Sequence, residues 1–319
     1  MSDRLLKILA GILLFFVLAW VAARLLSGGG EERAPFDLAS AAGLEPDSVV
    51  VVGPGDTVRL RADGEWKVNG HAAVSDAGET LRSALEDAEV GQLVSRNPDN
   101  HGRLGVTPDS GHVLTIYAGG EAKLALIIGK RAELFDRAYV RRPDDVEVFT
   151  LQGNLVNLAR RGADDWRERQ IVSAVRGDIQ RIEYTYGDTS FALARDSAGW
   201  HVEPSGRAVA EGSVEPVLNN LAELRALGFA EDSIADTLSW ESPSARVTVV
   251  GPDDARIAEL EFIRREENVG YFVRRFGEPV VYTLSSFSGD QILKRRAELA
   301  PPSVAKESAP EDQPARPPD

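Results

Sequence analysis

Two segments, Tyr139–Leu151 (YVRRPDDVEVFTL) and Phe272–Leu284 (FVRRFGEPVVYTL), are copies of one pattern. Val140 matches Val273, so the copies are offset by 133 residues (273 − 140), and the same offset holds at the other end of the pattern. In each copy, two runs rich in β-branched and aromatic residues flank a short turn of Pro, Asp or Gly, which is typical of a β-hairpin. A repeat over so long a distance predicts two units of similar architecture.

Matching strands precede both hairpins. Thr57–Arg61 alternates apolar and charged residues, the pattern of a half-buried strand, and Phe191–Arg195 is its counterpart. A turn then leads into Trp66 in the first unit and Trp200 in the second, and these markers of the repeat lie 134 residues apart (200 − 66). Further strands are predicted at His112–Tyr117, Leu124–Ile128, Ala245–Val250 and Ile257–Phe262.

One amphipathic helix is expected in each unit. Asp76 and Glu79 have the spacing of a capping box, and an apolar stripe follows from Leu81. Ser213 is the expected cap of the second helix. Further helical segments are predicted at Gly153–Arg169, which is polar, and at Gly289–Leu299.

The short connections rich in Gly and Asp favour antiparallel pairing. The expected fold class is therefore α+β, with two tandem repeats, each an antiparallel sheet backed by a helix, after one N-terminal transmembrane helix. The expected boundaries are a membrane anchor at 1–27, a linker at 28–46, repeat domain 1 at 47–160, repeat domain 2 at 161–299 and a disordered tail at 300–319.

The N-terminal segment predicts the membrane anchor. Ile8–Ala23 contains no charged residue, and the surrounding apolar span approaches the roughly 20 residues that a bilayer core requires. Arg4 and Lys7 favour a cytoplasmic N-terminus, which places the bulk of the chain outside the cytoplasm. Val21–Ala23 also resembles a cleavage site, so a cleaved signal peptide is the alternative.

Composition narrows the possible partners and chemistry. The net charge of −14 argues against nucleic acid as a partner. The chain contains no Cys, which excludes disulfides and thiolate chemistry. Its four histidines are too far apart in sequence for a helical metal-binding pair, and no Gly-x-Ser-x-Gly motif is present. We therefore expect no catalytic residues, no metal site and no cofactor.

The arginine pairs of the two hairpins are the most notable polar feature. Strand alternation places the two members of each pair on opposite faces, so that one faces a partner and the other pairs within its own unit. The alternative is a solvated edge strand protected by charge. The candidate interface consists of Tyr139, Arg141, Arg142, Phe272, Arg274 and Arg275.

The order of these motifs resembles the bacterial family known as domain of unknown function 4340. The resemblance rests on Trp66, Ala73-Val74, Leu104–Pro108, Ile128-Gly129, Tyr139–Arg142 and Val148–Leu151, and extends over about Val49–Leu299. The second copy departs from the pattern, with Leu238–Pro243 in place of the Leu-Gly segment and Phe262 near the position of Gly129. The resemblance implies a membrane-anchored protein of the type linked to gliding-motility-type ABC transport systems, and it implies no catalytic residues.

Two functions are consistent with the sequence. The first is a non-enzymatic accessory or scaffold protein of the inner (cytoplasmic) membrane, single-pass, with the bulk of the chain extracytoplasmic. Such a protein would serve ABC-type transport or envelope assembly through contacts with a transporter permease or another envelope subunit. The second is a periplasmic module that binds glycan or peptidoglycan in the cleft between the repeats.

Overall fold

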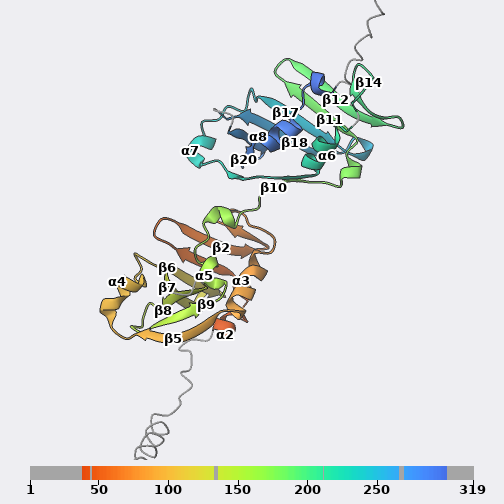
Figure 1. Cartoon of the computed structure of the whole chain (residues 1–319). Helices are drawn as coiled ribbons and strands as arrows, with labels where there is room; N and C mark the ends of the chain where they lie inside the picture. Colours follow the sequence, from red (N-terminus) through yellow and green to blue (C-terminus); the bar gives the residue numbers. More distant parts are fainter. Residues whose placement is uncertain (1–37, 44, 133–135, 211, 266–268, 300–319) are drawn as a thin grey trace, which may run out of the picture. The chain divides into compact units, whose positions relative to one another are not determined.

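The computed structural model describes residues 38–43, 45–132, 136–210, 212–265 and 269–299 (Figure 1). The chain divides into unit 1, which ends at Arg167, and unit 2, which begins at Glu168. The sequence analysis placed this boundary after residue 160. The predicted membrane anchor, residues 28–37 of the predicted linker and the predicted tail lie outside the described residues. Within the described ranges, no helix has both the length and the apolar character needed to cross a membrane.

Unit 1 contains one large antiparallel sheet. In spatial order its nine strands in the described residues are β4 (His71–Ala72), β3 (Glu65–Val68), β2 (Thr57–Asp63), β1 (Ser48–Val52), β6 (His112–Ala118), β7 (Glu121–Arg131), β8 (Arg137–Arg141), β9 (Val148–Gln152) and β5 (Glu89–Ser95). Its helices are α2 (Leu38–Ala42), α3 (Ala77–Glu86), α4 (His101–Leu104) and α5 (Leu155–Leu158), with 3₁₀ turns at Pro98–Asn100 and Ala163–Asp165.

Unit 2 repeats this arrangement. Its nine-stranded sheet has the order β14 (Arg207–Ala208), β13 (Gly199–Glu203), β12 (Thr189–Asp196), β11 (Arg181–Tyr186), β17 (Ala245–Val250), β18 (Arg256–Arg264), β19 (Gly270–Arg275), β20 (Tyr282–Ser285) and β16 (Gly228–Phe229). A separate two-stranded sheet joins β10 (Gln170–Ser173) to β15 (Glu223–Arg225). The helices are α6 (Glu215–Ala222), α7 (Asp232–Ala235) and α8 (Ser286–Ile292), with 3₁₀ turns at Arg176–Asp178, Pro252–Asp254 and Arg296–Leu299.

The two sheets share strand order and pairing register. Val49 pairs with Leu60 in unit 1 and Ile182 pairs with Leu193 in unit 2, an offset of 133 on both strands (182 − 49 and 193 − 60). The hairpins that opened the sequence analysis keep the same offset, because both form antiparallel pairs with corresponding partners across β8–β9 and β19–β20. The α+β class is thus observed, with strands predominating over short helices.

Each sheet buries one face against helices. In β2, Val58 and Leu60 are buried while Arg59 and Arg61 are exposed, as strand alternation predicts. The apolar side of α3 and the buried residues of α5 pack on this inner face of unit 1 (Figure 1). In unit 2, α6 and the β10–β15 pair pack on the corresponding face. Each unit therefore has its own core.

The two tryptophans that mark the repeat occupy matching places. Trp66 and Trp200 are both partly buried and pack against the core of their own unit. The carbonyl of Trp66 accepts a hydrogen bond from the amide of Ala73, and the carbonyl of Trp200 accepts one from Val209. Neither ring is fully exposed, as a duplicated architecture requires.

Several local predictions were wrong. Asp76 is the N-cap of α3 but its side chain makes no cap bond, and the Glu79 carboxylate accepts hydrogen bonds from Arg82. The Ser213 hydroxyl donates to the carbonyl of Ala210 and does not cap α6.

The boundaries of three other segments also differ from those predicted. The segment expected as a polar helix at 153–169 contains the short helix α5, whose Leu155, Val156 and Leu158 are buried, and it ends in a turn before β10. The last helix, α8, begins at Ser286 because Ser285 caps it, and it ends at Ile292. The expected linker contains α2, whose Leu38 joins the core of unit 1.

Candidate functional site

The predicted interface residues of unit 1 lie mostly inside the protein. Tyr139 is partly buried and packs against a small apolar cluster, which includes Leu104 of α4, on the outer face, the sheet face opposite α3 and α5. Arg141 is only 7% exposed. Its guanidinium donates to four backbone carbonyls, those of Val106, Arg142, Pro143 and Asp145. Burial lowers the pKa of Arg141, and the Asp145 carboxylate opposes that shift. Arg142 is exposed and forms an ion pair with Asp144.

The unit 2 counterparts are also engaged within their own unit. Phe272 is buried. Arg274 binds the Glu261 carboxylate at 2.7 Å on the outer face. Arg275 points the other way, where its Nε donates to the carbonyl of Ile171 on β10. The two members of this pair thus lie on opposite faces, and both have partners within unit 2.

A row of three residues across neighbouring strands differs between the two units. In unit 1 the row is Val113, Ile127 and Arg141. In unit 2 the strand pairing puts Arg246, Glu261 and Arg274 in the same row. The Glu261 carboxylate accepts hydrogen bonds from Arg246 at 2.6 Å and from Arg274 at 2.7 Å, and its side chain is 0% exposed. The row therefore contains two apolar residues and one arginine in unit 1, and three charged residues in unit 2.

Aromatic rings cover this charged row. Arg274 lies over the ring of Trp240 at 4.4 Å from its centroid, and Arg246 lies over the ring of Phe276 at 5.1 Å. Trp240 lies in the segment that follows α7. In unit 1 the matching part of the chain contains α4 and the segment after it. Because guanidinium–aromatic stacking excludes water at little cost to the charge, Glu261 is buried without losing its partners. Phe276 remains 52% exposed, so the row carries an apolar surface above its charges.

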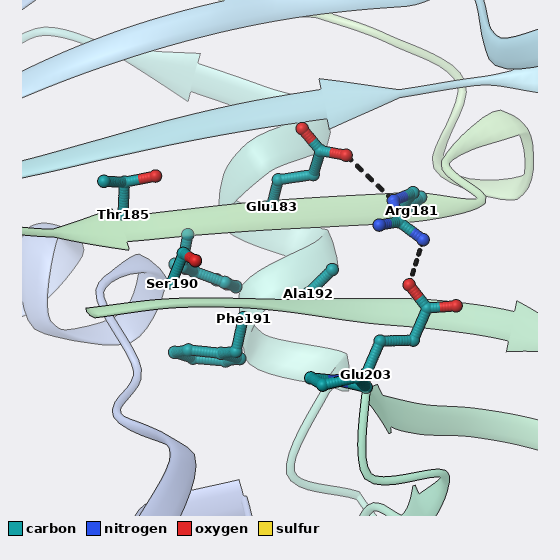
Figure 2. Close-up of a pocket in the computed structure, with 9 residues that line it drawn as sticks. Arg181, Glu183, Thr185, Ser190, Phe191, Ala192 and Glu203 are labelled. Atoms are coloured by element: carbon teal, nitrogen blue, oxygen red, sulfur yellow. Dashed lines mark hydrogen bonds and ion pairs between the residues drawn. The ribbon is translucent and has the colours of Figure 1, made fainter. Parts of the chain in front are cut away.

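Both outer faces also contain a depression at the same place. In unit 1 a depression of 520 Å³ lies over β1 and β2 and includes Ser48, Val50, Arg59 and Arg61. In unit 2 one of 330 Å³ lies over β11, β12 and the end of β13 (Figure 2). The 133-residue offset matches Ser48 with Arg181 and Val50 with Glu183. The two depressions are therefore equivalent positions of one architecture.

The unit 2 depression is organised around Arg181. Figure 2 shows its guanidinium between the carboxylates of Glu183, on the same strand, and Glu203, on β13. The Nε–Glu183 distance is 2.9 Å. The hydrogen bond that Arg181 donates to Glu183 raises the pKa of Arg181, burial opposes this shift, and the hydrogen bond to Glu203 adds to the rise. Thr185 and Ser190 complete the polar rim. This arrangement offers hydrogen-bonding groups on a shallow surface.

The histidines occupy separate environments. His112 is partly buried near Asp56 and Arg160; burial and then Arg160 lower its pKa, and Asp56 opposes the shift. His101 bonds the carbonyl of Val146 at 2.9 Å, and His201 lies 3.4 Å from Asp196. In the part of the chain that the structure describes, no group of three or more His, Asp or Glu side chains is arranged to hold a metal ion.

A comparison with protein families gives a match. The family model described as Domain of unknown function (DUF4340) covers residues 59–240, more than half of the chain. The chain belongs to the DUF4340 family. The matched region runs from β2 of unit 1 to Trp240 of unit 2. Comparison with curated proteins and with solved structures finds no match.

Sequence reasoning missed the most distinctive residues of this DUF4340 protein. Glu261 occupies a polar position in a strand that alternates apolar and polar residues, so its sequence context predicts an exposed side chain. Its carboxylate instead binds Arg246 and Arg274 on neighbouring strands, and the Trp240 ring stacks on Arg274. The signal available in the sequence was the mismatch between repeats, because the offset aligns Arg246 with Val113. The predicted membrane context of the DUF4340 chain rests on residues outside those described.

Proposed function

We propose that the chain is a non-enzymatic accessory protein, anchored in the cytoplasmic membrane, whose extracytoplasmic units serve ABC-type transport or envelope assembly through contacts with other proteins. The observation that carries this proposal is the pair of equivalent depressions on the outer faces of the two sheets. Both are shallow and are lined by charged side chains, which suits contact with a protein surface better than enclosure of a reacting substrate.

The two depressions differ in charge. The unit 1 depression has two arginines, Arg59 and Arg61, and one carboxylate, Asp47, so its lining is positive. The unit 2 depression has two carboxylates, Glu183 and Glu203, and one arginine, Arg181, so its lining is negative. Complementary charge steers association and selects partners more than it adds affinity. A chain that presents one architecture twice, with opposite charge, suits the joining of two different surfaces. This property supports a scaffold.

The N-terminal sequence supports the location. A membrane helix at 1–27 followed by a tether would hold both units beside neighbours in the same membrane, and tethering raises their effective concentration there. On the family resemblance, the partner is a transporter permease or another envelope subunit.

Site-specific photocrosslinking in intact cells tests the contacts. A photoreactive residue is placed at Arg61 or at Thr185, both exposed on the outer faces, and for comparison at Glu86, which is exposed on α3. We expect crosslinks to membrane or envelope proteins from the first two positions and none from Glu86. Equal crosslinking from all three positions, or none from the outer faces, would contradict the proposal. Capture of glycan instead of protein would favour the ligand-binding alternative.

A fusion reporter tests the location. A reporter that is active only after export, joined after Leu299, is expected to be active. Activity of a reporter that works only in the cytoplasm would refute the proposed topology.

A further inference from the structure

One end of the unit 2 sheet contains a pocket of 460 Å³. Its walls come from the end of β11, the start of β17, the end of β18, the start of β19, α8 and the segment after α8. This volume lies within the range of about 300–1,000 Å³ that is usual for small-molecule sites. Segments far apart in the sequence therefore converge on one small cavity.

The same end of unit 1 is built differently. Arg131 pairs with Ala138 in unit 1, and Arg264 pairs with Tyr271 in unit 2, at the common offset of 133 (264 − 131 and 271 − 138). Both arginines contact the helix beneath them, through Asn157 at 2.9 Å and Asp290 at 3.4 Å. In unit 2 the Tyr271 ring lies next to this contact, whereas unit 1 has Ala138 at the matching position.

A compensating change makes room for that ring. A Cβ atom on Gly289 would lie 2.2 Å from the ring of Tyr271, so any other residue would collide with it. At these positions unit 1 has Ala138 and Val156, a small residue on the strand and a larger one on the helix. Unit 2 reverses the sizes, which shows that the tyrosine is accommodated by its own helix.

A second tyrosine holds an arginine at the pocket. Tyr186, which aligns with Gly53 of unit 1, donates its hydroxyl to the carbonyl of Lys294 at 2.8 Å. The Arg295 guanidinium stacks on the Tyr186 ring at 3.7 Å from its centroid. Burial raises the pKa of Tyr186, so the ring remains a neutral phenol. The stacked guanidinium has a restricted orientation.

The charged side chains of the pocket differ in the hydrogen bonds and ion pairs that they make. Asp290 accepts hydrogen bonds from Tyr271 and Arg264, and Glu298 accepts one from the amide of Arg295. Among the described residues, the Arg295 guanidinium makes no hydrogen bond or ion pair. Its N–H groups are therefore oriented by stacking and open to an external acceptor.

We infer that this pocket binds a small zwitterion, an amino acid or a short peptide, whose carboxylate is held by Arg295 and whose ammonium group lies near Glu298. A planar guanidinium matches a carboxylate with two parallel hydrogen bonds. The lining contributes two arginines and two carboxylates, which suits a ligand with no net charge. A phosphate dianion would be repelled by Asp290 and Glu298.

Titration calorimetry with the purified full-length chain tests this inference. The probes are alanine, alanyl-alanine, the C-terminal amide of that dipeptide and inorganic phosphate. We expect saturable binding of alanine, of the dipeptide or of both, and the comparison of these two assigns the source. We expect the amide and phosphate to bind at least about tenfold more weakly. The amide has no carboxylate for Arg295 to bind, and phosphate carries a second negative charge and no ammonium group.

Variants identify the pocket as the site. Arg295→Ala should weaken binding at least about tenfold, and Arg295→Lys should recover only a small part, because lysine keeps the charge without the planar fork. Arg207→Ala, a change at an exposed arginine on β14 of the same unit, is the matched control and should bind as the unchanged protein does. The inference is overturned by absence of saturable binding to both zwitterions, by phosphate binding as tightly, or by an Arg295→Ala variant that retains full affinity.

Discussion

Replacing the charged row of unit 2 with the apolar row of unit 1 tests how Glu261 is tolerated inside the protein. The changes are Glu261→Ile and Arg246→Val, which reproduce the Val113–Ile127 pair. Glu261→Ile alone leaves two facing guanidiniums without their shared carboxylate. Loss of one member of a buried ion pair costs about 3–5 kcal/mol, and we expect about 3 here because both arginines are partly exposed.

The double change should cost much less than the sum of the single changes. Arg246→Val alone removes one charged hydrogen bond to Glu261, about 1.5–3 kcal/mol. With both changes, Arg274 faces an apolar neighbour as Arg141 does in unit 1. We therefore expect a coupling energy of at least about 2 kcal/mol between the two positions. In a unit of this size, a loss of about 3 kcal/mol corresponds to a fall in Tm of roughly 6–12 °C.

Native-state amide hydrogen exchange in β17, β18 and β19 is the suitable assay, because it reports the opening free energy of unit 2 separately from unit 1. Arg256→Ala is the control, since the Arg256 side chain is 64% exposed in its ion pair with Glu259 and its loss should cost at most about 1 kcal/mol. If the two single effects simply add to within about 0.5 kcal/mol, the arginines do not compensate the buried carboxylate and the reasoning fails.

Three further predictions concern other parts of the fold. The lowered pKa of His112 contributes stability that is present above its ordinary pKa of 6.5 and is lost as the pH falls below it. His112→Gln should therefore flatten the decline in urea midpoint between about pH 8 and pH 5, and an unchanged decline would contradict this reasoning. Gly289→Val should destabilise unit 2 by about 1–3 kcal/mol through collision with Tyr271, and adding Tyr271→Ala should restore most of the loss in a denaturation series; an unaffected single variant would contradict the packing argument. Trp66→Ala and Trp200→Ala should each cost about 3–5 kcal/mol by the same measurement, and losses below about 1 kcal/mol would show that these rings are not structural.

The regular part of the fold was predictable because it depends on short-range patterns. Alternation located the strands that carry Arg59 and Leu193, and the repeat offset located both hairpins. The edge strand β5 escaped prediction because its pairing with β9 is interrupted by register shifts, which erase any simple alternation. The small β10–β15 sheet escaped it as well, because its strands are short and their partners are remote in sequence.

The candidate site was less predictable because burial of charge depends on distant segments. Arg141 has the local pattern of a surface arginine, yet the turn between β8 and β9 folds its carbonyls around the guanidinium. Glu261 is buried by residues from three other strands or loops. The repeat comparison is the one tool in the sequence that identifies such positions, since it shows where matched rows differ in charge.

The place of β5 in the sheet has a consequence for synthesis. The ribosome makes Glu89–Ser95 before Val148–Gln152, and β9 is the neighbour of β5 in the sheet. While β6, β7 and β8 emerge, the nascent chain holds a strand without its hydrogen-bonding neighbour, which is a risk for aggregation. Most side chains of β5 are polar or small, and its irregular register discourages pairing with foreign strands. The irregular edge thus protects the growing chain during the interval before its sheet can close.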